Sequence, residues 1–290
     1  MSILLDETNR IVVQGITGKV ARFSVRDIAA YGPRVVAGTA PGRSGIEVEG
    51  VPVFPNIEAA VAETGADSAL VYVPAPSALD AVLEAVDAGL RLIVYPGDGL
   101  PMADAIEMRA AAKLNGTALV APNTPGLISP SKGKLGFMPS FCYTPGPVGV
   151  ISRSGSLSYE ASHRLTAAGI GQTTVLGIGG DQVKGINASE ALTLFHDDPE
   201  TKAIVFLGEI GGTDEYELAA YAERADAKPV AAVVVGRASP PGRKMGHAGA
   251  LIGSHADSHE AKVRALRAAG VATAAELSAL IPDVQRVLGE

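Results

Sequence analysis

The sequence predicts an α/β protein with two domains, and three observations support this fold class. Short apolar runs recur along the chain, and each ends in a cluster of Gly or Pro. Segments with apolar residues at helical spacing lie between these runs, most clearly residues 57–64 and 78–88. The chain has 290 residues, 47% of them apolar, which is enough for two separate cores. Strands that alternate with helices indicate parallel sheets covered on both faces.

The first half of the chain is expected to form a Rossmann-like domain over residues 1–123. Its strand-like runs are 11–13, 35–37, 69–73, 92–94 and 118–120. The loops after them are rich in Gly and Pro, and in a parallel sheet such loops meet at the carboxyl edge, where ligands bind. These loops are 15–18, 39–45, 74–76, 96–101 and 122–126.

Residues 124–147 interrupt the alternation, because they are dense in Pro, Gly and Ser and have no helical period. We interpret them as a segment that connects two domains. From residue 148 the alternation resumes and predicts a flavodoxin-like domain over 148–290. Its expected strands are 148–151, 174–178, 203–207 and 230–235, and its expected helices include 157–168, 258–269 and 275–288.

The composition excludes several function classes. The chain has no Trp, 4% aromatic residues and a net charge of −7, so we expect no nucleic-acid partner. The single cysteine, Cys142, allows no internal disulfide and suits the reducing cytoplasm. The first ten residues lack the features of a signal peptide. No uncharged apolar run approaches the roughly 20 residues of a membrane span, so we expect no membrane association.

A glycine-rich loop over residues 236–253 is the strongest candidate for chemistry. It contains His247 between glycines, with Arg243 and Lys244 just upstream. Glycine lets backbone and ligand approach closely, and the two cations suit an anion such as phosphate. A histidine of ordinary pKa, about 6.5, is largely neutral at pH 7 and can act as a nucleophile. The loop fits a phosphoryl carrier, and the alternative is a surface loop with an incidental histidine.

Glu209 is the candidate partner of that histidine. It follows the apolar run 203–207 directly and stands between glycines. A carboxylate at the carboxyl edge of a strand can accept a hydrogen bond from one imidazole nitrogen, which fixes the tautomer and leaves the other nitrogen as nucleophile. The alternative is a solvated loop acid.

A strand-to-helix junction over residues 152–156 offers an anion cradle. Ser154, Gly155 and Ser156 would present hydroxyl groups and free backbone N–H groups to a phosphate. Serine at this place could also be only the N-cap of the following helix. The two roles are compatible.

A second such junction, residues 14–19, opens the first helix. Its glycines would point backbone N–H groups at an anion. The loop lacks the G-x-G-x-x-G fingerprint, and Ala21 stands where a later glycine is expected, so a plain tight turn is the alternative. Basic residues near the same edge suit a ligand with several phosphates; they are Lys19, Arg22, Arg34 and Arg43.

The other histidines give little support for a metal site. His163 and His196 fall on helix-like segments, and His255 and His259 have only an i, i+4 spacing with no cysteine nearby. We therefore expect no metal bound by this chain.

Taken together, the motifs resemble the alpha subunit of succinyl-CoA synthetase, or succinate–CoA ligase, along essentially the full chain. The matching motifs lie at residues 1–4, 14–18, 72–76, 122–123, 151–155, 177–181, 208–212 and 243–250. The G-I-G-G-D, G-E-I-G-G and R-K-M-G-H-A-G-A motifs are together highly specific. Family members usually have glycine at the position of Ala21, and the loops at 41–45, 96–101 and 123–126 also depart from the family pattern.

The resemblance implies a division of labour between the domains. The first domain would bind CoA, and the second would carry a phosphohistidine at His247 oriented by Glu209, with Ser154, Gly155 and Ser156 cradling the phosphate. The implied CoA contacts are Thr17, Gly18, Lys19, Arg43, Tyr72, Val73, Pro74 and Asn123.

The resemblance also implies the reaction and a partner. ATP or GTP would phosphorylate His247, the phosphate would pass to a small dicarboxylic acid in the tricarboxylic acid cycle, and CoA would attack the acyl phosphate. The chain has no G-x-x-x-x-G-K-[ST] motif. The nucleotide and its Mg²⁺ would therefore be bound mainly by a separate beta subunit with an ATP-grasp domain.

Three other interpretations remain at this point. A malate–CoA ligase alpha subunit would look similar. A non-catalytic CoA-binding regulatory subunit is compatible with the altered loops of the first domain. A nicotinamide-dependent oxidoreductase needs a dinucleotide fingerprint and an acid about 20 residues beyond it. The glycine pattern fails here, and the first acid after Gly18 is Asp27.

Overall fold

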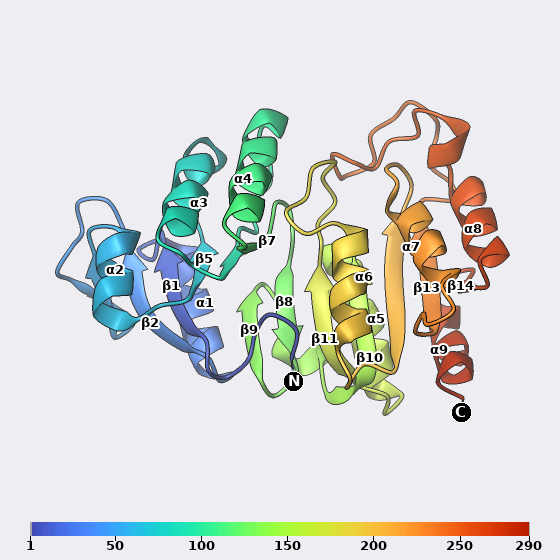
Figure 1. The fold of residues 1–290 in the computed structure, drawn as a ribbon, viewed down its shortest axis with the longest axis horizontal. Helices are drawn as coiled ribbons and strands as arrows, with labels where there is room; N and C mark the ends of the chain where they lie inside the picture. Colours follow the sequence, from blue (N-terminus) through green and yellow to red (C-terminus); the bar gives the residue numbers. More distant parts are fainter. Residues whose placement is uncertain (1, 290) are drawn as a thin grey trace. The chain divides into compact units, whose positions relative to one another are not determined.

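The computed structural model describes residues 2–289, which divide into two compact units. The first unit contains Leu4–Met138 together with Val183–Ile186. The second contains 2–3, 139–182 and 187–289 of the described residues. Figure 1 traces the elements of each unit.

The first unit is built on a seven-stranded sheet in the order β3-β4-β2-β1-β5-β6-β7. All neighbouring strands are parallel except the β3–β4 pair. This arrangement confirms the parallel α/β fold predicted for the first half. The strands are β1 (Arg10–Gln14), β2 (Arg34–Thr39), β3 (Glu47–Val48), β4 (Val51–Phe54), β5 (Ser68–Val71), β6 (Leu92–Val94) and β7 (Ala118–Val120).

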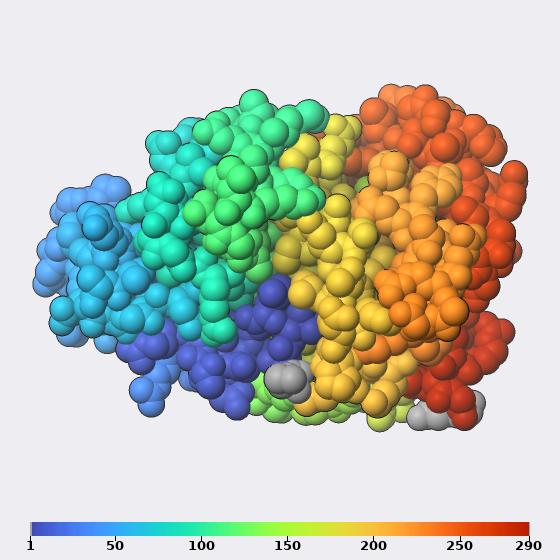
Figure 2. Space-filling model, viewed as in Figure 1, coloured from blue at the N-terminus to red at the C-terminus, as the bar shows by residue number. Residues whose placement is uncertain are grey.

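Four α-helices cover this sheet. They are α1 (Lys19–Ala29), α2 (Ile57–Thr64), α3 (Ala78–Asp87) and α4 (Met102–Leu114). Helix α3 packs between α2 and α4, and these three helices form the outer face of the unit in Figures 1 and 2. Helix α2 begins where the Asn56 side chain accepts a hydrogen bond from Ala59 N, and it ends at Gly65 in the left-handed conformation.

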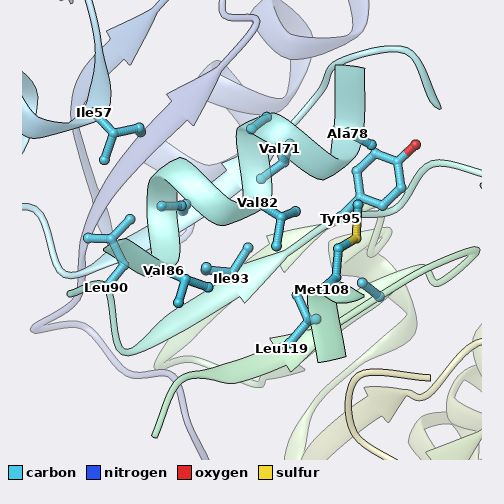
Figure 3. Close-up of a cluster of buried hydrophobic side chains, with 14 of the residues drawn as sticks. Ile57, Val71, Ala78, Val82, Val86, Leu90, Ile93, Tyr95, Met108 and Leu119 are labelled. Atoms are coloured by element: carbon cyan, nitrogen blue, oxygen red, sulfur yellow. The ribbon is translucent and has the colours of Figure 1, made fainter. Parts of the chain in front are cut away.

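The core of the first unit lies between its sheet and these helices. Figure 3 shows side chains from α3 and α4 interleaved with those of the strands, including Val82, Ile93 and Met108. Each of these three side chains is at most 1% exposed. Burial at roughly 25 cal/mol per Å² of apolar surface is the main term that stabilises such a layer.

The segment 124–147, predicted to connect two domains, contains regular structure of its own. Strands β8 (Gly126–Ser129) and β9 (Gly133–Gly136) form an antiparallel hairpin within the first unit. The two compact units divide after Met138, and the long first strand of the second unit already begins at Pro145. The hairpin backbones approach so closely that a Cβ at Gly126 would stand 2.0 Å from the Leu135 carbonyl oxygen. Glycines that suggested a linker therefore serve close strand pairing.

The second unit is built on five parallel strands in the order β14-β13-β12-β10-β11. They are β10 (Pro145–Ser152), β11 (Gln172–Gly177), β12 (Ala203–Glu209), β13 (Val230–Val235) and β14 (Ala272–Ala274). Every residue of β12 is buried, as expected for a central strand covered on both faces. The second half is thus a parallel α/β unit, as predicted.

Five α-helices cover the second sheet: α5 (Gly155–Ala167), α6 (Ala188–Asp197), α7 (Asp214–Ala222), α8 (His259–Ala268) and α9 (Leu280–Leu288). Helix α7 packs between α6 and α8, while α5 packs beside α9. Helix α6 begins with a capping box formed by Asn187 and Glu190. The last helix begins at Leu280, later than the predicted residue 275, because β14 and a short 3₁₀ turn (Leu277–Ala279) precede it.

Candidate functional site

The loop that carries His247 runs between β13 and α8, above the carboxyl ends of the strands in Figure 1. Backbone hydrogen bonds close it on itself: Gly242 N donates to the Ile252 carbonyl at 3.0 Å, and Met245 N donates to the Ala250 carbonyl at 2.9 Å. Gly249 N donates to the carbonyl of Gly180 at 2.9 Å, which fixes the loop to the end of β11. His247 therefore sits on a folded, anchored loop.

His247 and Glu209 form a direct pair. Nδ1 of the imidazole lies 2.8 Å from Oε2 of Glu209. Glu209 is the last residue of β12, and its side chain is 6% exposed against 25% for His247. The hydrogen bond to Glu209 raises the pKa of His247 above its usual value, against the opposing effect of burial. The structure thus brings together the two residues that the sequence singled out.

A glycine makes room for the His247 ring. A Cβ on Gly180 would stand 2.4 Å from both Cγ and Nδ1 of His247, a distance that backbone and ring could not tolerate. A second glycine, Gly211, has φ +75°, and a Cβ there would stand 2.1 Å from the Gly249 carbonyl oxygen. Gly180 of the G-G-D motif and Gly211 of the G-E-I-G-G motif are therefore explained by the close approach of three chain segments.

A cluster of buried charged side chains contacts the carboxylate and the backbone of Glu209. This cluster was not predicted from the sequence. Arg153 is 1% exposed, and its Nη2 lies 3.2 Å from Oε1 of Glu209, an ion pair without the alignment of a hydrogen bond. Its Nη1 donates to the backbone carbonyls of Glu209 (3.1 Å) and Gly211 (2.7 Å). Burial acts to lower the pKa of Arg153, but the carboxylates of Glu215, Asp214 and Glu209 outweigh it and raise that pKa. Arg153 is therefore charged.

Lys262 of α8 completes the cluster. Its ammonium group is fully buried, donates to the carbonyl of Glu209 at 2.9 Å and pairs with the fully buried carboxylate of Glu215. Glu215 in turn accepts a hydrogen bond from Glu209 N at 2.9 Å. Burial lowers the pKa of Lys262, with the Glu215 charge opposing. Two buried cations and a buried carboxylate thus fix the backbone that carries Glu209.

Helix α5 begins at the same sheet edge. Ser152 pairs in register with Leu207, two residues before Glu209, and Ser154 follows Arg153 directly. Ser154 is the N-cap residue of α5, but its side chain makes no capping hydrogen bond. The Ser154 hydroxyl therefore does not serve as a side-chain cap of the helix. Ser156 is exposed, and the two serine oxygens lie 3.5 Å apart. The helix start can present hydroxyl and N–H groups to an anion.

The carboxyl edge of the first sheet has the features of a phosphate site. Gly15 has φ +73°, and a Cβ there would stand 2.4 Å from the Tyr72 carbonyl oxygen. Helix α1 begins at Lys19 after the exposed Gly18, with no side-chain cap and no acidic residue in its first turn. Ala21 is fully buried, on the face of α1 that also carries Val25 and Ile28.

A cavity of about 400 Å³ opens at this edge. It is lined by Gln14, Gly15, Thr39, Ala40, Pro41, Pro55, Asn56, Val73, Ser77, Asp80, Ala81 and Glu84. These residues come from the ends of β1, β2, β4 and β5 and from α3, which is where a Rossmann-like sheet binds ligands. Of the eight residues expected to contact CoA, all of them within the described residues 2–289, only Val73 lines this cavity.

The remaining expected CoA contacts lie on the loops of the first unit. The Thr17 carbonyl accepts a hydrogen bond from Arg22 Nε at 3.3 Å. Arg43 and Pro74 are exposed, while the Tyr72 hydroxyl bonds to Ser24 Oγ at 2.7 Å. Asn123 has φ +51°, and its N–H donates to the Gly97 carbonyl at 2.8 Å.

Two of the other histidines, His163 and His196, contact aromatic side chains. His163 packs edge-on against Phe141, and His196 Nδ1 lies 3.2 Å from the Tyr221 hydroxyl. Among residues 2–289, no three His, Cys, Asp or Glu side chains gather in a way that could hold a metal ion. None of the helices in that range is long and apolar enough to cross a membrane.

Comparison with known proteins decides the family. The CoA binding domain family model matches residues 6–96, and the CoA-ligase family model matches residues 151–272. The chain is 46% identical over 288 residues to succinate–CoA ligase [ADP-forming] subunit alpha 1 of Archaeoglobus fulgidus, covering 99% of both chains. The chain belongs to the succinate–CoA ligase alpha subunit family. Its identity to the alpha subunits of Aquifex aeolicus and Staphylococcus aureus is 47% and 46%, over 93% and 95% of this chain and 89% and 91% of theirs.

Solved structures show the same fold in larger proteins. ATP citrate lyase from Methanothrix soehngenii matches 99% of this chain with a TM-score of 0.91 at 24% identity, and the match spans 50% of that protein. A dinucleotide-forming acetyl-coenzyme A synthetase from Ca. Korarchaeum cryptofilum matches 93% with a TM-score of 0.73 at 21% identity, over 58% of its length. This alpha subunit therefore corresponds to about half of each larger chain.

Proposed function

We propose that this alpha subunit forms a nucleotide-dependent acid–CoA ligase in which His247 carries the phosphoryl group, with succinate as the acid. The observation that carries the proposal is the 2.8 Å contact between His247 Nδ1 and the buried carboxylate of Glu209. The relatives at 46% and 47% identity are named succinate–CoA ligase [ADP-forming], which supports the choice of reaction.

The tautomer set by this contact assigns the roles of the two ring nitrogens. Nδ1–H donates to Glu209, so Nε2 carries the lone pair. Nε2 attacks the terminal phosphorus of ATP or GTP, the N–P bond forms, and the P–O bond to the nucleoside diphosphate breaks with its electron pair leaving on oxygen. Glu209 stabilises the positive charge that the imidazole gains. Ser154, Gly155 and Ser156 would receive the phosphate at the start of α5.

Two further transfers complete the reaction. A carboxylate oxygen of the acid takes the phosphoryl group from Nε2, which gives an acyl phosphate and restores His247. The CoA thiol then attacks the acyl carbon, and the C–S bond forms. Phosphate leaves with the electron pair of the C–O bond and takes up the thiol proton. The histidine relay divides one difficult transfer into easier ones.

CoA would bind at the carboxyl edge of the first unit. Lys19 and Arg43 supply exposed positive charge for its phosphates, and the uncapped start of α1 supplies N–H groups. The adjacent cavity of about 400 Å³ is large enough for part of such a ligand. Thr17, Gly18, Tyr72, Val73, Pro74 and Asn123 are the further contacts proposed there.

The active enzyme would need a partner. A phosphohistidine requires a phosphoryl donor site, and we assign the nucleotide and its Mg²⁺ to a beta subunit with an ATP-grasp domain. The relatives are named as alpha subunits, which supports this assembly. We also assign the complex to the cytoplasm, because the single cysteine, Cys142, is a buried free thiol and not part of a disulfide framework.

The test is a reconstitution with a dicarboxylate panel. The chain is purified alone and with its beta subunit, and nucleotide-dependent CoA-ester formation is measured with succinate, malate and other dicarboxylates. Activity only in the complex, with succinate the fastest acid, is expected. Full activity of the lone chain would contradict the partner assignment, and CoA binding without ester formation from any acid would favour a regulatory subunit.

A further inference from the structure

The second unit contains a cavity that shares no lining residue with the His247 site. Its volume is about 420 Å³, within the range of small-molecule sites. The lining residues are Arg237, His259, Glu260, Val263, Arg264 and Arg267. They come from the residues after β13 and from one side of α8.

The lining of the cavity has an excess of positive charge. It has three guanidinium groups against the single carboxylate of Glu260. Arg264 and Arg267 are three residues apart on one helix face, a spacing at which like charges destabilise a helix. The helix dipole favours Arg267, which is in the last turn of α8, and Glu260 stands four residues before Arg264, a stabilising spacing. A bound anion would compensate this charge.

Two of the guanidinium groups are held in place by backbone carbonyls. Arg237 Nη2 donates to the Ala275 carbonyl at 3.3 Å, and Arg267 Nη2 donates to the Thr273 carbonyl at 3.5 Å. Each bond uses one donor of a group that has five, so the rest of each planar fork can face a ligand. Arginines from two separate chain segments thus line one cavity.

His259 adds a buried polar atom to the same wall. The residue is 8% exposed, and its Nδ1 is buried with no hydrogen-bond partner among the described residues. An unsatisfied buried polar atom is costly and rare in native proteins. Burial and the nearby charge of Arg237 lower the pKa of His259, against the opposing effects of Glu260 and the Val234 backbone.

We propose that this cavity is a second, separate binding site for a small polyanion, a molecule with two or more phosphate or carboxylate groups. The three arginines would bind the anionic groups as charge-assisted forks, and Val263 would provide an apolar wall. His259, once an anion lies beside it, would be able to hold a proton and add positive charge to the site.

The test uses the full chain with two probes, inorganic pyrophosphate and citrate, titrated separately by calorimetry. Binding of pyrophosphate would indicate a phosphate ligand, and binding of citrate would indicate a carboxylate ligand. The variant Arg264→Ala/Arg267→Ala removes two exposed guanidinium groups, and Arg224→Ala, an exposed arginine paired with Asp226, is the matched control. The double variant should weaken binding of at least one probe about tenfold or more, because charged hydrogen bonds are lost, and the control should not.

A local readout separates this cavity from the His247 site. The His259 imidazole signal, assigned with His259→Asn, is followed by NMR against pH with and without the probe. The pKa of His259 should rise when the probe binds, and this rise should vanish in the double variant. Failure of both probes to bind at millimolar concentration, or binding that the double variant retains, would overturn the proposal.

Discussion

Gly180 and His247 lie so close that the glycine has no room for a Cβ, which would stand 2.4 Å from the imidazole Nδ1. Gly180 follows β11, whereas His247 lies on the loop after β13, so two distant chain segments meet at the ring. The position of the imidazole therefore depends on a residue that has no side chain.

Gly180→Ala should displace the His247 ring and slow its phosphorylation by about 10²-fold, the usual cost of a misplacement near 1 Å. The measurement is the rate of acid-labile labelling in the assembled complex, alongside a thermal unfolding curve. Gly253→Ala is the control in the same loop, because its Cβ would meet only Asp257 at an ordinary 3.6 Å. Equal labelling rates in the two variants would mean that ring placement is not limiting.

Glu209→Gln should slow phosphorylation by about 10²-fold and also shift its pH dependence. Glu209 raises the pKa of His247, and the nucleophile must be neutral. The rate of phosphorylation in the wild type should therefore rise with pH through this raised pKa. In the variant, the same rise in rate should occur at lower pH. If the variant were slower but its rate rose over the same pH range as in the wild type, the substitution would have disrupted the site generally and not only removed the orienting carboxylate.

The raised pKa of His247 also predicts a pH-dependent stability. A group whose folded pKa exceeds its unfolded value contributes stability that is fully present below the unfolded pKa, about 6.5, and is lost as pH rises through the folded pKa. The wild type should thus lose stability relative to His247→Asn between about pH 6 and the folded pKa. Denaturant midpoints measured across pH 5 to 9 test this, and a pH-independent difference would contradict it.

Lys262→Met should destabilise the second unit by about 3–5 kcal/mol, because it leaves the buried carboxylate of Glu215 with one cation fewer. Lys202→Met is the control, since Lys202 is exposed and should change stability by about 0.5 kcal/mol or less. Chemical denaturation provides the comparison. If the two variants unfolded alike, the buried cluster would have no structural role.

Lys19→Ala and Arg43→Ala should each weaken CoA binding about tenfold and reduce its salt dependence, because both side chains are exposed cations at the proposed phosphate edge. Ala21→Gly should leave the affinity unchanged, since Ala21 is fully buried in α1, while costing about 1 kcal/mol of stability. Calorimetry of the full chain measures both. A large gain in affinity with Ala21→Gly would mean that Ala21 obstructs the loop.

Elements with a clear period or a long apolar run were predictable from the sequence. Helix α2 and strand β13 begin and end at the predicted residues. Helix α4 was given no bounds, because apolar side chains lie on both its faces: Met102, Ile106 and Leu114 are exposed, whereas Ala105, Met108 and Ala112 are buried. The last helix was predicted too long. A helix from residue 275 would place Pro282 in its interior, where proline clashes with the preceding turn.

At the site, local motifs were enough to select His247 and Glu209 but not the cluster that supports them. Lys262 lies 53 residues from Glu209 on a helix that reads as polar, and lysine is almost always exposed. The packing of α8 against α7 and β13 buries it. Arg153 had one usable signal, its place directly after a buried strand.

The most direct test of the central claim is to map the phosphate. The complex of this chain and its beta subunit is incubated with γ-labelled ATP or GTP, and the acid-labile label is located by peptide mapping. We predict label on His247, discharged by succinate and CoA, and none in His247→Asn. Label that maps to another residue, or that persists in His247→Asn, would contradict the account.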